Sequence, residues 1–139
     1  MAGTEIKILG RLGEDIAADF LENNGYRILR RNVCLGKNEL DIIAEDDDYI
    51  VFVEVKTRAY PYPESGDVNI PSTAVDKKKR SNTVKAARDY LFQNYVNKQP
   101  RIDVIEVYML KQKSELEKPT LLKVNHIRNA FDARGRKLH

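Results

Sequence analysis

The chain has 139 residues, of which 42% are hydrophobic and 32% are charged, and its formal net charge is +3. A chain of this length builds one hydrophobic core, so we expect a single domain over residues 1–139, with a core from about residue 10 to 131 and a basic tail over 132–139. No run approaches the ~20 apolar residues of a membrane span and the N-terminus lacks a signal-peptide core, so we expect a cytoplasmic protein without membrane contact.

Cysteine and histidine are too few for a disulfide framework or a zinc centre. Cys34 has no partner for an internal disulfide, which fits a reducing compartment, and we expect it to pack within a strand. His126 and His139 do not complete a zinc site with a lone cysteine.

An amphipathic helix is predicted over Arg11–Asn24, ended by Gly25. Gly13 lies in its apolar stripe, where a glycine lets a helix approach a sheet closely. Glu14 lies on the rim of the buried face, about 20° from Leu21. By position alone, Glu14 is either a helix-start carboxylate favoured by the macrodipole or a functional group. The apolar stripe comprises Leu12, Ile16, Ala17, Phe20 and Leu21.

The next segments predict a strand over Tyr26–Asn32, a link over Val33–Lys37 and then a β-hairpin. The hairpin strands are Leu40–Ala44 and Ile50–Val55, and the acidic run Asp46–Asp48 marks the turn. With the turn centred there, the residue numbers of two facing residues add up to 95. Asp41 then lies opposite Glu54, and Glu39 lies opposite Lys56. Period-2 alternation puts these four side chains on one face. The other face is apolar, with Leu40, Ile42, Ala44, Val51, Val53 and Val55.

Facing carboxylates on paired strands repel one another, and burial would raise their pKa values. A hard divalent ion between Asp41 and Glu54 would relieve both effects, and Mg²⁺ or Mn²⁺ suits such oxygen ligands. Lys56, on the same face, could orient a water or offset the charge of a phosphate. The alternative interpretation of E-x-K alone is an ordinary solvated hairpin face.

After the hairpin, the sequence predicts a long loop over Ala59–Thr73 and a helix over Ala74–Tyr95. Val84, Ala87, Leu91 and Tyr95 form the predicted core-facing stripe of that helix. Its first turns carry Lys77, Lys78 and Lys79. This basic run is either a solvated face or a phosphate-binding segment at a helix N-terminus.

The remaining chain predicts a strand over Arg101–Leu110, a short strand over Leu121–Val124 and a short helix over Val124–Phe131. Asp103 lies on the first of these strands. We expect Asp103 to pair with Arg101 or to stabilise a turn, and we leave it out of the candidate site.

Several motifs resemble one known family. An acidic residue followed at a distance by E-x-K is similar to the PD-(D/E)xK nuclease core, although Leu40 stands in place of the proline. N-E-L-D-I-I-A and V-F-V-E-V-K-T-R resemble the G-E-I-D-L-I-A and V-F-V-E-V-K-x-R of the YraN-like family. The family pattern G-x-x-G-E-x-x-A-x-x-x-L also matches the first helix, and R-I-D-V-I resembles R-F-D-V-V. Cys34 and Asn38 stand where the family usually has arginine and glycine.

The resemblance implies a restriction-endonuclease-like fold akin to archaeal Holliday-junction resolvases, an α/β sandwich of order αβββαβ with a mixed central sheet. It also implies Glu14 as a third acidic ligand and Lys79 as the lysine that follows Val75. We therefore expect a metal-dependent endonuclease in which Glu14, Asp41 and Glu54 hold Mg²⁺ and Lys56 positions the water. Arg58, Lys77, Lys78 and Lys79 would contact nucleic acid, DNA in preference to RNA. A homodimer is left open. The alternatives are a nucleic-acid-binding module without turnover and a protein-interaction scaffold.

Overall fold

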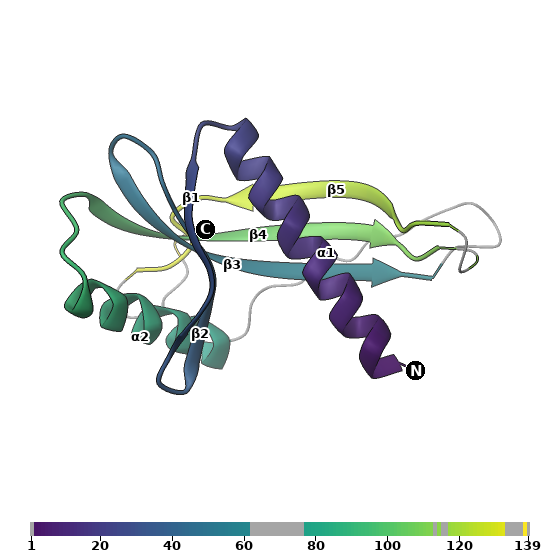
Figure 1. Ribbon diagram of the computed structural model, residues 1–139, viewed down its shortest axis with the longest axis horizontal. Coiled ribbons are helices and arrows are strands. Elements are labelled where there is room, and N and C mark those ends of the chain that lie inside the picture. Colours follow the sequence, from purple (N-terminus) through teal and green to yellow (C-terminus); the bar gives the residue numbers. More distant parts are fainter. Residues whose placement is uncertain (1, 62–76, 113, 115–116, 133–137, 139) are drawn as a thin grey trace.

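The structure is a computed structural model that describes residues 2–61, 77–112, 114, 117–132 and 138, with the side chains of 2–6, 77 and 78 left out. It is a mixed α/β fold with one five-stranded sheet in the order β1-β2-β3-β4-β5 (Figure 1). Strands β3 and β4 pair in parallel, and the other neighbours are antiparallel. The elements in chain order are α1 (Ala2–Asn23), β1 (Arg27–Leu35), β2 (Asn38–Glu45), β3 (Tyr49–Tyr60), α2 (Lys77–Gln93), β4 (Gln99–Leu110) and β5 (Thr120–Ile127).

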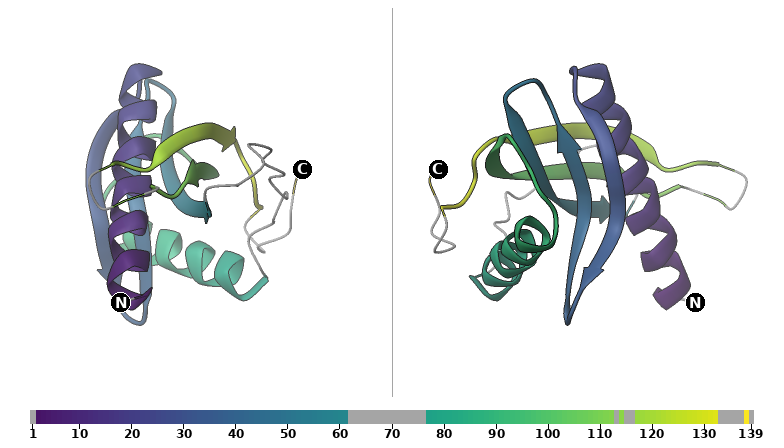
Figure 2. Two further views of the ribbon diagram at one scale, coloured as in Figure 1. Left: turned by 90° about the vertical axis from the view of Figure 1, so that its right-hand side faces the viewer. Right: turned by 60° about the vertical axis from the view of Figure 1, so that its left-hand side comes forward.

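The two helices cover opposite faces of the sheet. Figure 1 shows α1 lying across β3, β4 and β5, and the right-hand view of Figure 2 shows α1 and α2 on opposite sides of the β1–β2 hairpin. Two separate groups of buried apolar side chains follow from this arrangement. The α1 side includes Leu21, Ile42, Val53, Ile105 and Met109. The α2 side includes Ile43, Phe52, Val84, Ala87 and Val104.

The predicted hairpin register is confirmed. Ile42 pairs with Val53 and Glu45 pairs with Ile50, so facing residues sum to 95. The turn is stabilised by Asp46, whose side chain accepts hydrogen bonds from the backbone N–H groups of Asp48 and Tyr49 at 2.9 and 2.7 Å. One detail of the predicted faces is wrong, because Leu40 packs on the α2 side while Ile42 packs on the α1 side. The central strands are therefore buried on both faces.

Other predictions differ from the structure at the ends of elements. The predicted helix over Val124–Phe131 is wrong, because β5 continues to Ile127 in register with β4 and ends in a turn. Phe131 is nevertheless buried. Tyr95 was expected to face the core, but α2 ends at Gln93 and Tyr95 is 93% exposed.

Strands β1 and β3 are longer than predicted. Most of the predicted link Val33–Lys37 belongs to β1, and Cys34 is exposed on that strand instead of packed. The first residues of the predicted loop Ala59–Thr73 belong to β3, which continues to Tyr60. Residues 62–76 of the predicted loop and helix start, and most of the basic tail, lie outside the described residues. Within the described part of the chain, neither helix is both long and apolar enough to cross a membrane.

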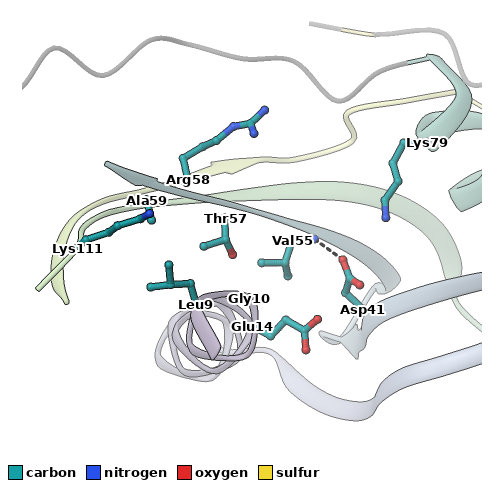
Figure 3. A pocket seen from close by; sticks show the side chains of 10 residues that line it. All are labelled: Leu9, Gly10, Glu14, Asp41, Val55, Thr57, Arg58, Ala59, Lys79 and Lys111. Atoms are coloured by element: carbon teal, nitrogen blue, oxygen red, sulfur yellow. Dashed lines mark hydrogen bonds between the residues drawn. The ribbon is translucent and has the colours of Figure 1, made fainter. Parts of the chain in front are cut away.

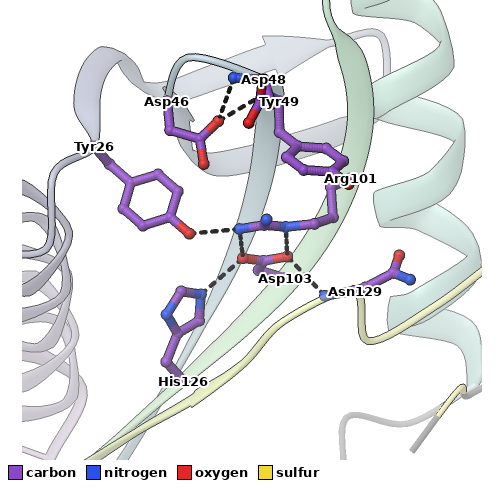
Figure 4. A network of polar contacts seen from close by, with 8 residues as sticks. All are labelled: Tyr26, Asp46, Asp48, Tyr49, Arg101, Asp103, His126 and Asn129. Carbon is purple, nitrogen blue, oxygen red and sulfur yellow. Dashed lines mark hydrogen bonds and ion pairs between the residues drawn. The ribbon is translucent and has the colours of Figure 1, made fainter.

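A buried polar network fixes the start of β4 against its neighbours (Figure 4). Asp103, which is fully buried, receives two hydrogen bonds from Arg101 at 2.9 and 2.8 Å. It also contacts His126 Nε2 at 2.7 Å and accepts from the backbone N–H of Asn129 at 2.9 Å. Arg101 in turn donates to the Tyr26 hydroxyl at 2.7 Å. The expected pairing of Asp103 with Arg101 is confirmed, and its role here is structural.

Candidate functional site

The site begins where β2 and β3 separate. The pairing of β2 with β3 ends at Ile42 and Val53, whereas β3 stays paired with β4 as far as Tyr60 and Leu110. Asp41 lies at this point, and its Oδ2 accepts a hydrogen bond from the backbone N–H of Val55 at 2.8 Å. A side-chain oxygen thus satisfies a strand N–H that has lost its partner strand. The same contact fixes the Asp41 carboxylate at the edge of β3.

Asp41 and Glu54 form a close pair of carboxyl groups, as the hairpin register predicts. Glu54 is only 2% exposed and shares a hydrogen bond with Asp41. Burial, followed by the charge of Glu54, raises the pKa of Asp41 to about 7, and the Val55 hydrogen bond only partly opposes this. Burial also raises the pKa of Glu54, against the opposing effect of Lys79. Two neighbouring carboxyl groups with raised pKa values are typical of functional sites.

Helix α2 brings a cation and a hydroxyl group to this pair. Lys79 Nζ lies 3.0 Å from Glu54 Oε1, and its side chain is 51% exposed. Thr83, one helical turn later and almost fully buried, places its Oγ1 3.4 Å from Glu54 Oε2 and 3.0 Å from the Lys79 carbonyl oxygen. Burial alone would lower the pKa of Lys79, but the charge and hydrogen bond of Glu54, together with the charges of Asp41 and Glu39, outweigh burial and raise that pKa.

Helix α1 supplies Glu14 from the other side of Asp41. Burial and then the charge of Asp41 raise the pKa of Glu14, against the effects of Asn32 and Arg31. With its amide oriented toward two acidic acceptors, Asn32 donates to Glu14 Oε2 at 3.1 Å and to Glu39 Oε1 at 3.3 Å. Asn32 has a φ of 52°, a left-handed conformation that asparagine tolerates better than most residues.

A glycine sets how closely α1 approaches the site. A Cβ atom added at Gly13 would lie 2.0 Å from Thr57 Oγ1 on β3, so only glycine fits this crossing without a shift. The predicted close approach of the helix to the sheet is therefore confirmed at Gly13. Because Glu14 is the next residue, this contact also positions its carboxylate.

These elements enclose a cavity of about 420 Å³ along the free edge of β3 (Figure 3). Glu14 and Asp41 line one part of it, with Lys79 above Asp41. Arg58 and Lys111 line the part farther along β3. The cavity therefore combines half-buried acidic groups with cationic walls, which suits an anionic ligand that is held together with a cation. Its remaining lining residues are Leu9, Gly10, Val55, Thr57 and Ala59.

Comparison with known proteins places the chain in a family. A family model described as "Uncharacterised protein family UPF0102" matches residues 13–107. The chain belongs to this family. A UPF0102 protein of Caldanaerobacter subterraneus is 46% identical over 126 residues, which cover 90% of this chain and 95% of the relative. UPF0102 proteins of Chlorobium phaeobacteroides and Persephonella marina are 41% and 38% identical, each covering about nine tenths of this chain and 94% of the relative.

The structure of this UPF0102 member brings some of the predicted residues together and leaves others apart. Asp41, Glu54 and Lys79 are in contact, and Glu14, Asp41, Arg58 and Lys79 line the cavity. Lys56 lies two residues after Glu54 on β3, half-buried, and its side chain makes no hydrogen bond or ion pair with the described residues. Lys77 and Lys78 begin α2, but their side chains lie outside the described part.

The three predicted acidic ligands do not form a preformed metal-binding site. Within the described residues, no group of three or more His, Cys, Asp and Glu side chains is arranged to hold a metal ion. Asp41 and Glu54 are adjacent, whereas Glu14 faces Asn32 and Arg31. A role for Glu14 as a third metal ligand stays a prediction.

Sequence reasoning did not select three polar residues of this site. Thr83 could have been found, because its i+4 spacing from Lys79 places both on one helix face. Asn32 was predicted only as the end of a strand, and its contact with Glu14 depends on a left-handed backbone conformation. Lys111 follows β4 and reaches the cavity because its backbone N–H donates to the Tyr60 carbonyl at 2.8 Å, a contact that no local pattern indicates.

Proposed function

We propose that this UPF0102 protein is a Mg²⁺- or Mn²⁺-dependent endonuclease that hydrolyses phosphodiester bonds in structured DNA or RNA. The observation that carries the proposal is the pair of carboxyl groups formed by the half-buried Asp41 and the buried Glu54. Asp41 lines the cavity together with Arg58, Lys79 and Lys111. A phosphodiester substrate and a divalent ion together match this distribution of charge. The E-x-K sequence on β3, next to an aspartate on β2, supports a restriction-endonuclease-like fold.

The residues fit a magnesium ion in two respects. The Asp41 and Glu54 oxygens are the hard donors that Mg²⁺ prefers, and Mg²⁺ commonly takes one or two carboxylates and keeps several waters. In addition, a cation already sits at this pair, since the Lys79 ammonium lies 3.0 Å from Glu54 Oε1. When bound, the ion would polarise a phosphoryl oxygen and lower the pKa of a bound water.

The remaining roles belong to side chains of this chain. Asp41 and Glu54 would hold the ion, with Glu14 across the cavity from them. Lys56, on the same strand as Glu54, would orient the attacking water. Arg58 and Lys79 would contact phosphate oxygens and offset their charge. Lys77 and Lys78 are proposed as further contacts at the start of α2.

A nuclease assay tests this proposal. Wild type is incubated with labelled four-way junctions, single strands and duplexes of DNA and RNA, with Mg²⁺, with Mn²⁺ or with a chelator. We expect cleavage with metal only and a loss of roughly a hundredfold or more in Asp41→Asn and Glu54→Gln. Asp15→Asn, which removes an exposed carboxylate beside Glu14, is the matched control and should cleave like wild type. Equal cleavage by wild type and Asp41→Asn would point to a contaminating nuclease and would contradict the proposal.

The second candidate is a nucleic-acid-binding protein without turnover. It is favoured by the Lys79–Glu54 ion pair, which already compensates one carboxylate without any metal. Binding of the same substrates without cleavage in either metal would select this function. Three further predictions stay open to test: binding of DNA in preference to RNA, a homodimer, and a cytoplasmic location. A protein-interaction scaffold also stays a prediction, and it would be favoured if the protein bound no nucleic acid.

A further inference from the structure

Lys79 contacts the acidic pair in an unusual way for a surface lysine. Its side chain is half-exposed, yet its ammonium is 3.0 Å from a glutamate whose side chain is only 3% exposed. The α2 backbone at Lys79 is fixed from below by Thr83, whose hydroxyl lies 3.0 Å from the Lys79 carbonyl oxygen. The flexible stem of the side chain thus starts from a fixed point and ends at a buried carboxylate.

The ammonium also borders the cavity beside Asp41. Figure 3 shows the Lys79 side chain descending from α2 toward Asp41, while Glu14 approaches from α1. Lys79 therefore lies where a cation would balance Asp41 and Glu54. A divalent ion bound to the same oxygens would repel the ammonium at this distance and would attract the two carboxylates more strongly.

We propose that Lys79 is the resident counter-cation of the Asp41–Glu54 pair, that a divalent metal ion displaces it, and that the released ammonium then contacts a substrate phosphate. This inference rests on the proposed function, because it assumes that the pair binds a divalent ion. Its physical basis is the exposure of the lysine, since a long side chain that is half in solvent can leave the pair without disturbing the core. Metal binding would then open a phosphate contact that is closed in the metal-free protein.

The first experiment titrates MgCl₂ alone, without nucleic acid, into wild type, Lys79→Met and the control Lys85→Met. Lys85 is an exposed lysine on the same helix. Lys79→Met keeps the apolar stem and removes the competing charge, so we expect it to melt lower in chelator and to bind Mg²⁺ roughly tenfold tighter by calorimetry. Lys85→Met should match wild type in both measurements.

The second experiment follows the release of Lys79 directly. Wild type is treated with an amine-acetylating reagent with chelator or with saturating MgCl₂, and acetylation is quantified at each lysine by mass spectrometry. A lysine that leaves a carboxylate becomes more accessible and more readily deprotonated. We expect Mg²⁺ to raise the rate at Lys79 several-fold and to leave Lys85 unchanged.

The outcomes separate this inference from the proposed function. If wild type binds Mg²⁺ but acetylation of Lys79 is unchanged and Lys79→Met binds no tighter, the inference is wrong while the proposed function stands. If Mg²⁺ binds and releases Lys79 but no nucleic acid is cleaved, the inference stands and the endonuclease proposal fails. Absence of Mg²⁺ binding to both wild type and Lys79→Met would overturn the inference and the metal-dependent function together.

Discussion

Asp41 has to satisfy two requirements that conflict in the metal-free protein. Its Oδ2 accepts the Val55 N–H at the edge of β3, which favours an ionised carboxylate. Its burial and the neighbouring Glu54 disfavour the same charge, and their effect dominates, since the pKa of Asp41 rises to about 7. Near neutral pH the charge on Asp41 therefore destabilises the fold. A cation bound between the two carboxylates would relieve this repulsion.

The first prediction concerns Asp41→Asn. An asparagine oxygen still accepts the Val55 N–H, while the charge facing Glu54 disappears. We expect the variant to melt a few degrees higher than wild type at pH 8 in chelator. Opposed like charges on paired strands cost up to about 1 kcal/mol when exposed, and their cost increases when they are buried. Added Mg²⁺ should raise the melting temperature of wild type and leave that of the variant unchanged. If Asp41 were instead a structural ion-pair partner, the variant would melt lower than wild type in chelator.

The second prediction follows from the sign of the same pKa shift. Because the folded protein holds the Asp41 proton up to about pH 7 and the unfolded chain releases it near pH 4, the contribution of Asp41 to the stability of wild type falls as the pH rises between these values. The advantage of Asp41→Asn over wild type, measured by urea unfolding in chelator, should therefore be smallest near pH 4 and grow until about pH 7. An advantage that is constant over this range would mean that Asp41 is not the titrating group.

At the scale of elements, the hairpin register and the close approach of α1 at Gly13 could be predicted, and the polar contacts of the helices could not. The acidic turn and the alternation of β2 and β3 specify a register, because a slip by one residue would turn every side chain to the other face of the sheet. The contacts of Glu14 with Asn32 and of Lys79 with Glu54 depend on where each helix crosses the sheet. That crossing is set by packing between distant segments, as at Gly13 and Thr57. The predicted last helix failed for a similar reason, because pairing with β4 extends β5 to Ile127.

The third prediction tests the crossing of α1 over β3. Gly13→Ala places a Cβ about 2.0 Å from Thr57 Oγ1, so α1 or the threonine must shift, and we expect a loss of about 1–3 kcal/mol in unfolding free energy. Gly10→Ala is the matched control on the same helix. Nothing lies within 4 Å of its added Cβ, so it should stabilise the protein by about 0.5–1 kcal/mol.

Urea unfolding measures both glycine variants, and Gly13→Ala combined with Thr57→Ala supplies a double-mutant cycle. The combined variant should recover part of the loss, because the closest clashing atom is gone. A destabilisation of equal size in Gly10→Ala would assign the effect to helix flexibility instead of to the crossing. If the effects of Gly13→Ala and Thr57→Ala on unfolding free energy were fully additive, the contact at the crossing would also not be the cause of the destabilisation.

At the scale of the molecule, the Asp103 network and the Asp41–Glu54 pair differ in the direction of their carboxyl pKa shifts. Burial acts to raise the pKa of Asp103, but hydrogen bonds from His126, Arg101 and the Asn129 N–H outweigh it and lower that pKa. At the Asp41–Glu54 pair, burial and mutual repulsion prevail. The Asp103 network therefore stabilises the fold at neutral pH, whereas the acidic pair destabilises it. We therefore assign the proposed function to the Asp41–Glu54 pair, whose charge destabilises the fold, and a structural role to Asp103.

The fourth prediction is that Asp103→Asn costs about 3–5 kcal/mol in unfolding free energy at pH 7, because it leaves the nearly buried Arg101 without its carboxylate. Since the folded pKa of Asp103 is lowered, its contribution is present above about pH 4 and is lost as the pH falls through the folded pKa. The difference between wild type and variant should therefore shrink in acid. Asp15→Asn, which breaks an exposed pair with Arg31, should cost under about 1 kcal/mol. An equally small cost for Asp103→Asn would contradict the structural role of the network.

The last prediction concerns how charge is distributed over a chain whose net charge is only +3. Arg58 lines the cavity, whereas Arg27 lies near the hairpin turn, where it pairs with Glu45. Arg58→Ala and Arg27→Ala remove the same charge from these two places. If nucleic acid follows the cavity, Arg58→Ala should weaken binding of single-stranded and junction DNA alike and reduce the slope of log affinity against log salt by about one. Arg27→Ala should leave that slope unchanged. Fluorescence anisotropy at several salt concentrations measures both, and equal effects of the two variants would mean that binding follows the net charge and not this cavity.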